Sequence, residues 1–222
     1  MANATLTRTR LKTPSAAAIA GLLFSLLLMA AFALLRISVH PQELGSWLRT
    51  NSQTVALATN LVPFAGIAFL WFIGVLRDRL GELEDRFFAT VFFGSGLLFL
   101  SMLFLACSFV DGVLIAFATK PEEMIGSATF QFVRAAIYAM INVYMVKMAG
   151  VFMITTSTIA LYTGIAPRWL AVFGYALALL LLFGSYYISW SFAVFPIWVF
   201  LLSVCILADN FRRKLQLGGY SP

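Results

Sequence analysis

Charge is what this sequence has least of. Only 11% of its 222 residues are Asp, Glu, Lys or Arg, and 62% are hydrophobic, whereas roughly a quarter of the residues in a globular domain are charged. The mean hydropathy is +0.94. Several uncharged runs exceed the roughly 20 residues that a helix needs to cross about 30 Å of hydrocarbon. We therefore predict an all-α, polytopic transmembrane helical bundle that forms a single transmembrane domain.

Reactive side chains are scarce as well. Cys107 and Cys205 lie inside apolar runs without a CxxC partner, so we interpret both as small buried hydrophobic residues. The one histidine, His40, lies outside these runs, which excludes a bis-histidine haem site and an intramembrane Ser-His pair. Metal-ligand clusters and phosphate-binding glycine loops are absent from the sequence. We predict no catalytic residue, no metal and no cofactor.

Two further classes are disfavoured by what is missing. None of the predicted spans holds an Asp or Glu in its interior, so the usual carboxylate of a proton-coupled or sodium-coupled carrier is lacking. The net charge of +6 is not gathered on a soluble module, so we predict no nucleic-acid partner. The expected role of the basic residues is attraction to anionic lipid and orientation in the bilayer.

The charge that is present is concentrated in one segment. Residues 77–86, RDRLGELEDR, hold seven of the 24 charged residues and lie between the uncharged runs 50–76 and 87–110. This pattern predicts the charged inner hinge of a membrane hairpin. Glu82 and Arg86 form a favourable i,i+4 pair, so we expect the hinge to continue helically.

The apolar runs predict six transmembrane spans. Pro63 and Pro196 are expected to kink two of them, and Gly174 with Ala178 forms a small-xxx-small pair that favours close helix approach. The predicted spans are residues 15–35, 55–76, 87–110, 144–164, 169–188 and 191–208. Between the first two, residues 36–54 form a predicted outer loop with a short interfacial helix anchored by Trp47.

The segment before the fourth span is ambiguous. As one helix, residues 127–165 would be about 58 Å long at 1.5 Å per residue, nearly twice the hydrocarbon thickness. We expect residues 144–164 to span, with Lys147 snorkelling to the outer interface, and residues 127–143 to form an interfacial helix at or above the outer surface. A re-entrant segment and one long helix are the alternatives. A second outer loop is expected to begin at Asp111.

The basic residues orient this threading. Ten lie on its inner side and five on its outer side, as the positive-inside rule requires for both termini in the cytoplasm. The inner set is Arg8, Arg10, Lys12, Arg77, Arg79, Arg86, Arg168, Arg212, Arg213 and Lys214, and the outer set is Arg36, Arg49, Lys120, Arg134 and Lys147.

A polar stripe runs along the outer segment. Its members fall within about 80° of one another at 100° per residue: Gln131, Arg134, Tyr138 and Asn142. One interpretation is an outward-facing vestibule or anion-attracting site at Arg134, bridged to Asp111 or Glu123. The alternative is the solvent-exposed face of a surface helix.

Asn60 is a candidate of a different kind. It lies one turn before Pro63, as in the broken helices that form transporter binding points. The alternative is a packing contact with a neighbouring helix.

Two stretches carry a resemblance. Residues 60–98, NLVPFAGIAFLWFIGVLRDRLGELEDRFFATVFFGSGLL, and residues 195–213, FPIWVFLLSVCILADNFRR, resemble a group of bacterial six-span membrane proteins recorded only as hypothetical. The resemblance covers about a quarter of the chain. It implies a multi-pass protein of the bacterial inner (plasma) membrane, and it carries over no functional residue because the group has no assigned activity.

Three functions fit these features. The favoured one is a non-enzymatic membrane protein that acts through helix packing or contacts with a membrane-protein partner or a second copy. Its predicted inner contact is the hinge, with Arg77, Arg79, Glu82 and Arg86. The alternative is a small uncoupled transporter or channel with an outer vestibule at Arg134, Asn142 and Asn60. A membrane enzyme would need a pocket built from His40, Asp111 and Arg134.

Overall fold

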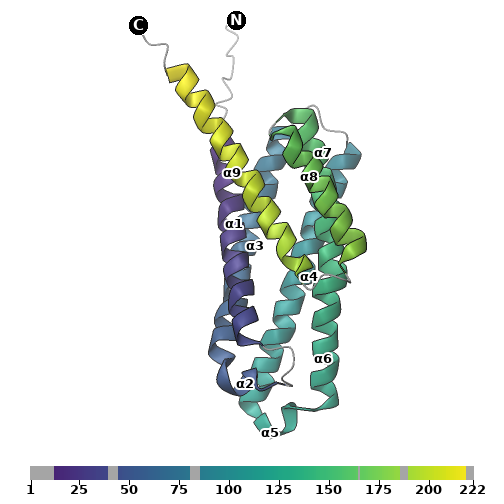
Figure 1. The fold of residues 1–222 in the computed structure, drawn as a ribbon. Helices are drawn as coiled ribbons and strands as arrows, with labels where there is room; N and C mark the ends of the chain where they lie inside the picture. Colours follow the sequence, from purple (N-terminus) through teal and green to yellow (C-terminus); the bar gives the residue numbers. More distant parts are fainter. Residues whose placement is uncertain (1–12, 40–44, 81–85, 165, 186–189, 219–222) are drawn as a thin grey trace, which may run out of the picture.

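The computed structural model describes residues 13–39, 45–80, 86–164, 166–185 and 190–218. Within these ranges all regular structure is helical, and the long helices lie side by side in one bundle (Figure 1). Five helices are long and apolar enough to cross a membrane, and a shorter sixth spans residues Arg168–Gly184. The prediction of an all-helical membrane protein is confirmed in this coarse form.

Within the described ranges, five helices have 18 or more residues: α1 (Thr13–Ser38), α3 (Ser52–Leu80), α4 (Arg86–Thr119), α7 (Val146–Thr163) and α9 (Ser191–Gly218). In the same ranges, two helices have 12 residues each, α6 (Ala128–Ala139) and α8 (Arg168–Leu179), and two have 4 residues each, α2 (Trp47–Thr50) and α5 (Pro121–Met124). Two π-helical stretches are inserted, η2 (Met140–Met145) and η3 (Leu180–Gly184). Helices α3 and α9 both run through their prolines, Pro63 and Pro196.

Most of the long helices extend beyond the predicted spans. Elements α6, η2 and α7 form one continuous helix over residues 128–163, about 54 Å at 1.5 Å per residue, so of the three alternatives for residues 127–143 the structure has the long helix. The predicted boundary at 143–144 falls inside η2. Helix α4 likewise continues through Asp111, whose carboxylate accepts a hydrogen bond from Thr59 on α3 at 2.7 Å.

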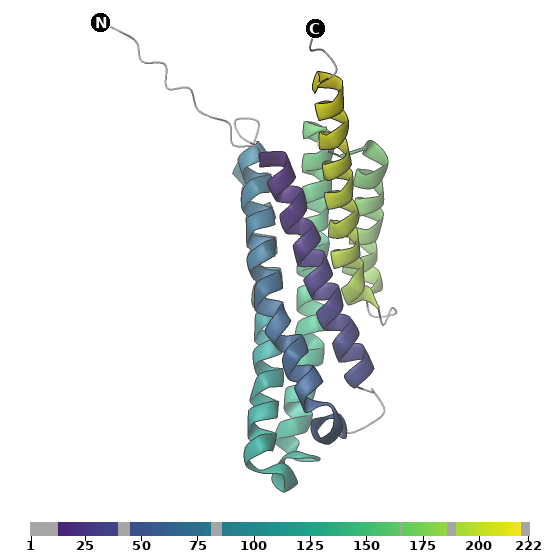
Figure 2. The same cartoon turned by 90° about the vertical axis from the view of Figure 1, so that its left-hand side faces the viewer.

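The bundle has two regions. We call the part in which α1, α3, α4, α7, α8 and α9 lie side by side the body. The end at which α2, α5 and α6 pack against the adjoining ends of α3 and α4 we call the extension (Figures 1 and 2). The extension has a small apolar core of its own, formed by Leu48, Val113 and Phe130 and flanked by Trp47, Leu114, Phe117, Met124, Ile125 and Val133.

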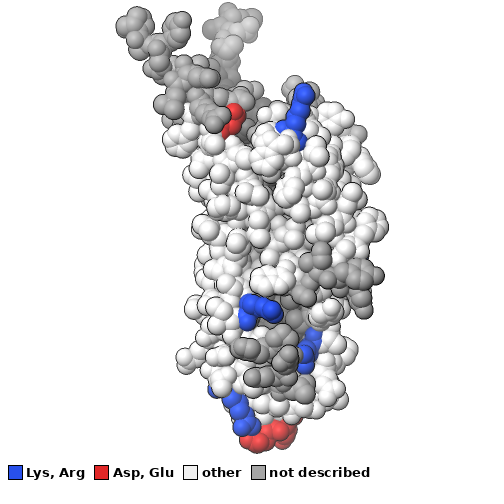
Figure 3. Space-filling view, viewed as in Figure 1, with Lys and Arg blue, Asp and Glu red and all other residues white. Residues whose placement is uncertain are grey.

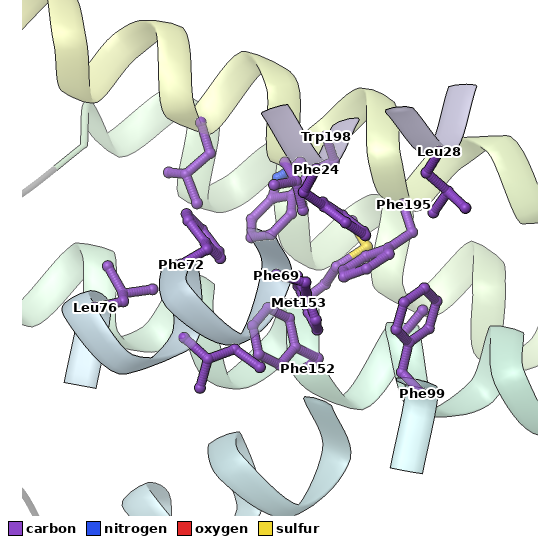
Figure 4. Packing of buried hydrophobic residues seen from close by; sticks show 14 of the residues in the cluster. Phe24, Leu28, Phe69, Phe72, Leu76, Phe99, Phe152, Met153, Phe195 and Trp198 are labelled. Atoms are coloured by element: carbon purple, nitrogen blue, oxygen red, sulfur yellow. The ribbon is translucent and has the colours of Figure 1, made fainter. Parts of the chain in front are cut away.

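Aromatic rings fill the middle of the body. Phe24 on α1 lies 4.5 Å from Phe69 on α3 between ring centroids, and Phe99 on α4 lies 4.6 Å from Phe195 on α9. Phe152 on α7 completes the set at 5.2 Å from Phe69. All five side chains are buried (Figure 4). Rings from five helices therefore meet in one cluster, which we call the aromatic plug.

Helices approach one another closely at Gly174, as predicted from its small-xxx-small pair with Ala178. A Cβ atom built on Gly174 would meet Ser157 Oγ on α7 and would lie 2.9 Å from Trp198 Nε1 on α9. Both Gly174 and Ala178 are buried. The absence of a side chain at Gly174 is thus what allows α7, α8 and α9 to approach one another here.

Lys147 has a described partner on the neighbouring helix. Its ammonium group donates a hydrogen bond to the Leu182 carbonyl in η3 at 2.8 Å. The last carbonyls of a helix lack partners within the helix and carry partial negative charge. Lys147 therefore binds the end of the neighbouring helix, and its snorkelling to the outer interface stays a prediction.

Charged groups are distributed in bands. On the face shown in Figure 3, Lys, Arg, Asp and Glu lie towards the upper end, in the lower third and at the lower tip, and a broad uncharged band separates the upper group from the others. At the tip, Arg49 lies 3.7 Å from Glu122, and Lys120 lies 3.0 Å from Glu123. The uncharged band lies across the middle of the body (Figure 3).

Candidate functional site

The candidate site is a cavity of about 320 Å³ where the body meets the extension. It is partly open to the surface. Its walls come from five places along the chain, and the described lining residues are Leu35, Val39, Gly45, Trp47, Val55, Val110, Val113, Phe130, Arg134, Ile137 and Ile141. Arg134 is the one charged residue among them, so the cavity is an apolar pocket with a cation in its wall.

One face of the long helix supplies the wall that carries this charge. Phe130, Arg134, Ile137 and Ile141 recur at spacings of four, three and four residues, which places them on one side of a helix. Ile141 lies in η2, and π-helical insertions are frequently found at functional sites. Arg134 lies at the border between this apolar face and the polar stripe.

The other members of the polar stripe do not line the pocket. Gln131 and Tyr138 are exposed, and Tyr138 retains 60% of its accessible surface. The Asn142 side chain donates a hydrogen bond to the Tyr138 carbonyl at 3.1 Å, within its own helix. The structure thus divides the predicted stripe into one pocket residue, Arg134, and three residues on the neighbouring surface.

Asn60 also lies apart from the pocket. It is exposed on α3, and its amide donates a hydrogen bond to the Ala56 carbonyl at 2.8 Å. Because this bond stays within one helix, Asn60 joins neither a neighbouring helix nor the pocket in the contacts described. The structure therefore does not bring the predicted vestibule residues Arg134, Asn142 and Asn60 together in one pocket.

The acidic residues expected near Arg134 have other described partners. Asp111 accepts a hydrogen bond from Thr59, and Glu123 pairs with Lys120. His40, the third member of the hypothetical enzyme site, lies outside the described residues. Within the described part of the chain, His, Cys, Asp and Glu side chains form no group of three that could hold a metal ion.

The charged hinge is described only at its edges. Arg77 is exposed, and its guanidinium carbon lies 5.4 Å from the centroid of the Phe93 ring on α4, a cation-π contact. The side chains of Arg79 and Arg86 and the whole of Glu82 lie outside the described residues. The predicted contact at the hinge stays a prediction.

Sequence reasoning missed the apolar walls of the pocket. The spacing of Phe130, Ile137 and Ile141 could have indicated a buried helix face, but its partners Leu35, Val55 and Val110 come from helices far apart in sequence. It also missed a run of hydroxyl residues on α7, residues 155–158. There Thr158 and Tyr175 share a hydrogen bond of 2.6 Å between α7 and α8.

No protein-family model matches the chain, and no curated protein or solved structure matches it either.

Proposed function

We propose that this chain is an integral membrane protein with six crossings that works by binding a ligand in the Arg134 pocket. Five helices are long enough to span, and α8 with η3 is a sixth crossing of 17 residues, about 25 Å long. The beginning of α1 and the end of α9 lie at the same end of the bundle (Figures 1 and 2). An odd number of crossings would place them at opposite ends.

The basic residues support a direction for this arrangement. With both termini in the cytoplasm, the extension and its pocket lie on the outer side, and the positive-inside rule is satisfied. The resemblance to bacterial six-span proteins supports the plasma membrane of a bacterium as the location.

The aromatic plug favours a binding protein over a transporter. Phe24, Phe69, Phe99, Phe152 and Phe195 are each at most 1% exposed, and they fill the body where a conducting path would pass. An uncoupled channel or transporter needs a water-filled path through its helices. The cavity at Arg134, by contrast, already has the concave and mostly apolar form of a ligand site. These features favour binding without passage.

Thiol modification by a water-soluble methanethiosulfonate tests the binding site. In a background with both native cysteines replaced by alanine, Ile137→Cys should react because Ile137 lines the pocket. Ser25→Cys, a near-isosteric control on α1 with no exposed surface, should not react. Protection of Ile137→Cys in lipid-free detergent would refute a water-accessible pocket, and rapid modification of both positions would support the transporter instead.

Labelling intact cells tests the orientation. An impermeant maleimide should label Glu122→Cys at the tip of the extension and should leave Arg168→Cys unlabelled until the cells are opened. The reverse pattern would place the extension inside the cell.

We also propose the inner hinge as a contact for a protein partner or a second copy. The stacking of Arg77 over Phe93 holds one hinge charge at the exposed end of the body, where a partner can reach it.

A further inference from the structure

Resting on the proposed binding role, we infer that the ligand is a phospholipid of the surrounding bilayer. One acyl chain would lie in the pocket, and the phosphate of an anionic headgroup would be bound by Arg134. Three properties of the pocket carry this inference: its walls, its depth along the bundle and its charge.

The walls select a hydrocarbon chain. Apart from Arg134, the described lining residues are aliphatic or aromatic, or glycine. A polar ligand placed against these walls would lose its hydrogen bonds to water without gaining new ones, which is costly. A volume of about 320 Å³ lies at the lower end of the range for ligand pockets, roughly 300–1,000 Å³. Such a space suits one chain better than two.

The depth of the pocket matches the surface of a bilayer. Leu35 and Val39 in its wall flank Arg36, whose guanidinium carbon lies 5.4 Å from the centroid of the Trp190 ring at the start of α9. Trp and Arg side chains are typical of the level of lipid headgroups. Since residues 13–35 of α1 carry no charge and Arg36 follows them directly, the apolar part of this helix ends at that level, and a lipid of the adjacent leaflet can reach the pocket with its headgroup still in water.

The charge selects the headgroup. Arg134 is exposed, and a guanidinium group carries five N–H donors in a planar fork that suits phosphate. A phosphate can therefore be bound in addition to contacts within the protein. A chain that moves from lipid into an apolar pocket gains little from the hydrophobic effect, because both environments exclude water. Selectivity must then come from the fit of the chain and from this charge, which favours a lipid of net negative charge.

Quenching of Trp47 by brominated acyl chains tests the inference, because Trp47 lines the pocket. The full-length chain, with Trp47 as its single tryptophan and the other four changed to Phe, is placed in vesicles of equal parts phosphatidylglycerol and phosphatidylcholine. Either one lipid or the other carries the bromine. We expect phosphatidylglycerol to associate at Trp47 about fivefold more strongly, which corresponds to ~1 kcal/mol.

Two variants and one matched position control this result. Arg134→Gln should remove the preference, and Arg134→Lys should retain it in part. A chain with Trp71 as its single tryptophan should show no comparable preference, because Trp71 is 68% exposed on the body. Equal quenching of Trp47 by both lipids would overturn the inference. So would a preference that survives in Arg134→Gln.

Native mass spectrometry of the unmodified chain gives a second measurement that needs no tryptophan changes. The wild type should retain phosphatidylglycerol through purification in mild detergent, and Arg134→Gln should lose most of it. Equal retention would overturn the inference.

The thiol experiment distinguishes a failure of the lipid assignment from a failure of the binding pocket. If Ile137→Cys reacts and no lipid preference is found, the pocket stands and the lipid is refuted. If Ile137→Cys is protected even in lipid-free detergent, the binding role itself fails.

Discussion

Replacing Gly174 by alanine should destabilise the bundle although alanine is the better helix former. The new Cβ atom would meet Ser157 Oγ and would lie 2.9 Å from Trp198 Nε1 and 3.1 Å from Trp198 Cε2. Trp198 is only 1% exposed, so its ring has little room to move. Overpacking of this kind typically costs about 1–3 kcal/mol.

A second glycine isolates this steric cost. Gly94 also lies in a long apolar helix, and a Cβ atom built on it meets nothing within 4 Å. Both Gly→Ala changes gain the same helix propensity, roughly 0.8–1.0 kcal/mol in water. The difference between Gly174→Ala and Gly94→Ala should therefore equal the overpacking cost, about 1–3 kcal/mol in favour of Gly94→Ala.

Thermal unfolding in one detergent, followed by intrinsic tryptophan fluorescence, measures this difference. On the scale of soluble proteins of this size, 1 kcal/mol shifts Tm by roughly 2–4 °C. The double variant Gly174→Ala/Ser157→Ala should recover part of the loss, because the hydroxyl oxygen that meets the new methyl group is gone. The packing argument is refuted if both glycine variants unfold at the same temperature, or if Ser157→Ala adds an independent loss to Gly174→Ala.

Three more predictions follow from other contacts. Phe69→Ala in the aromatic plug should cost about 3–5 kcal/mol, whereas Phe64→Ala on the same helix, where Phe64 is 62% exposed, should be nearly neutral in the same unfolding assay; similar losses would mean that the plug is not tightly packed. Lys147→Met should lower stability by about 1–3 kcal/mol through loss of the charged hydrogen bond to Leu182, and Lys147→Arg should lose less; no change in Tm would show that the bond contributes nothing. Neutralising the hinge should release a co-purifying partner or a second copy, and an unchanged pull-down would count against the hinge contact; the three residues to change are Arg77, Arg79 and Arg86.

The apolar runs were sufficient to predict the helices but not where each one ends. Hydropathy distinguishes apolar segments from polar ones. It does not show where a helix ends if the helix continues beyond its apolar part. The sequence predicts a loop from Asp111 because an acidic residue is costly in lipid. Its hydrogen bond from Thr59 depends on a contact across 52 positions of sequence, which periodicity cannot supply.

The candidate site was predicted in part for a similar reason. The stripe drew attention to Arg134, because the spacing within one helix is readable from sequence. The pocket depends on how α1, α3 and α4 pack against that helix, and such packing has no local signature. Lys147 shows the same limit, since its partner carbonyl belongs to η3, 35 positions away.

The unequal lengths of the helices have a consequence for the membrane itself. The apolar helix formed by α8 and η3 is 17 residues long, whereas the apolar stretch of α4 runs for 33 residues. In the proposed six-crossing arrangement, lipid beside this short wall must thin, at an elastic cost of fractions of a kcal/mol per Å, whereas α4 continues beyond the bilayer into the extension. Each copy would thus carry its own gradient of bilayer thickness, and two copies that bring like walls together would share one distortion instead of maintaining two.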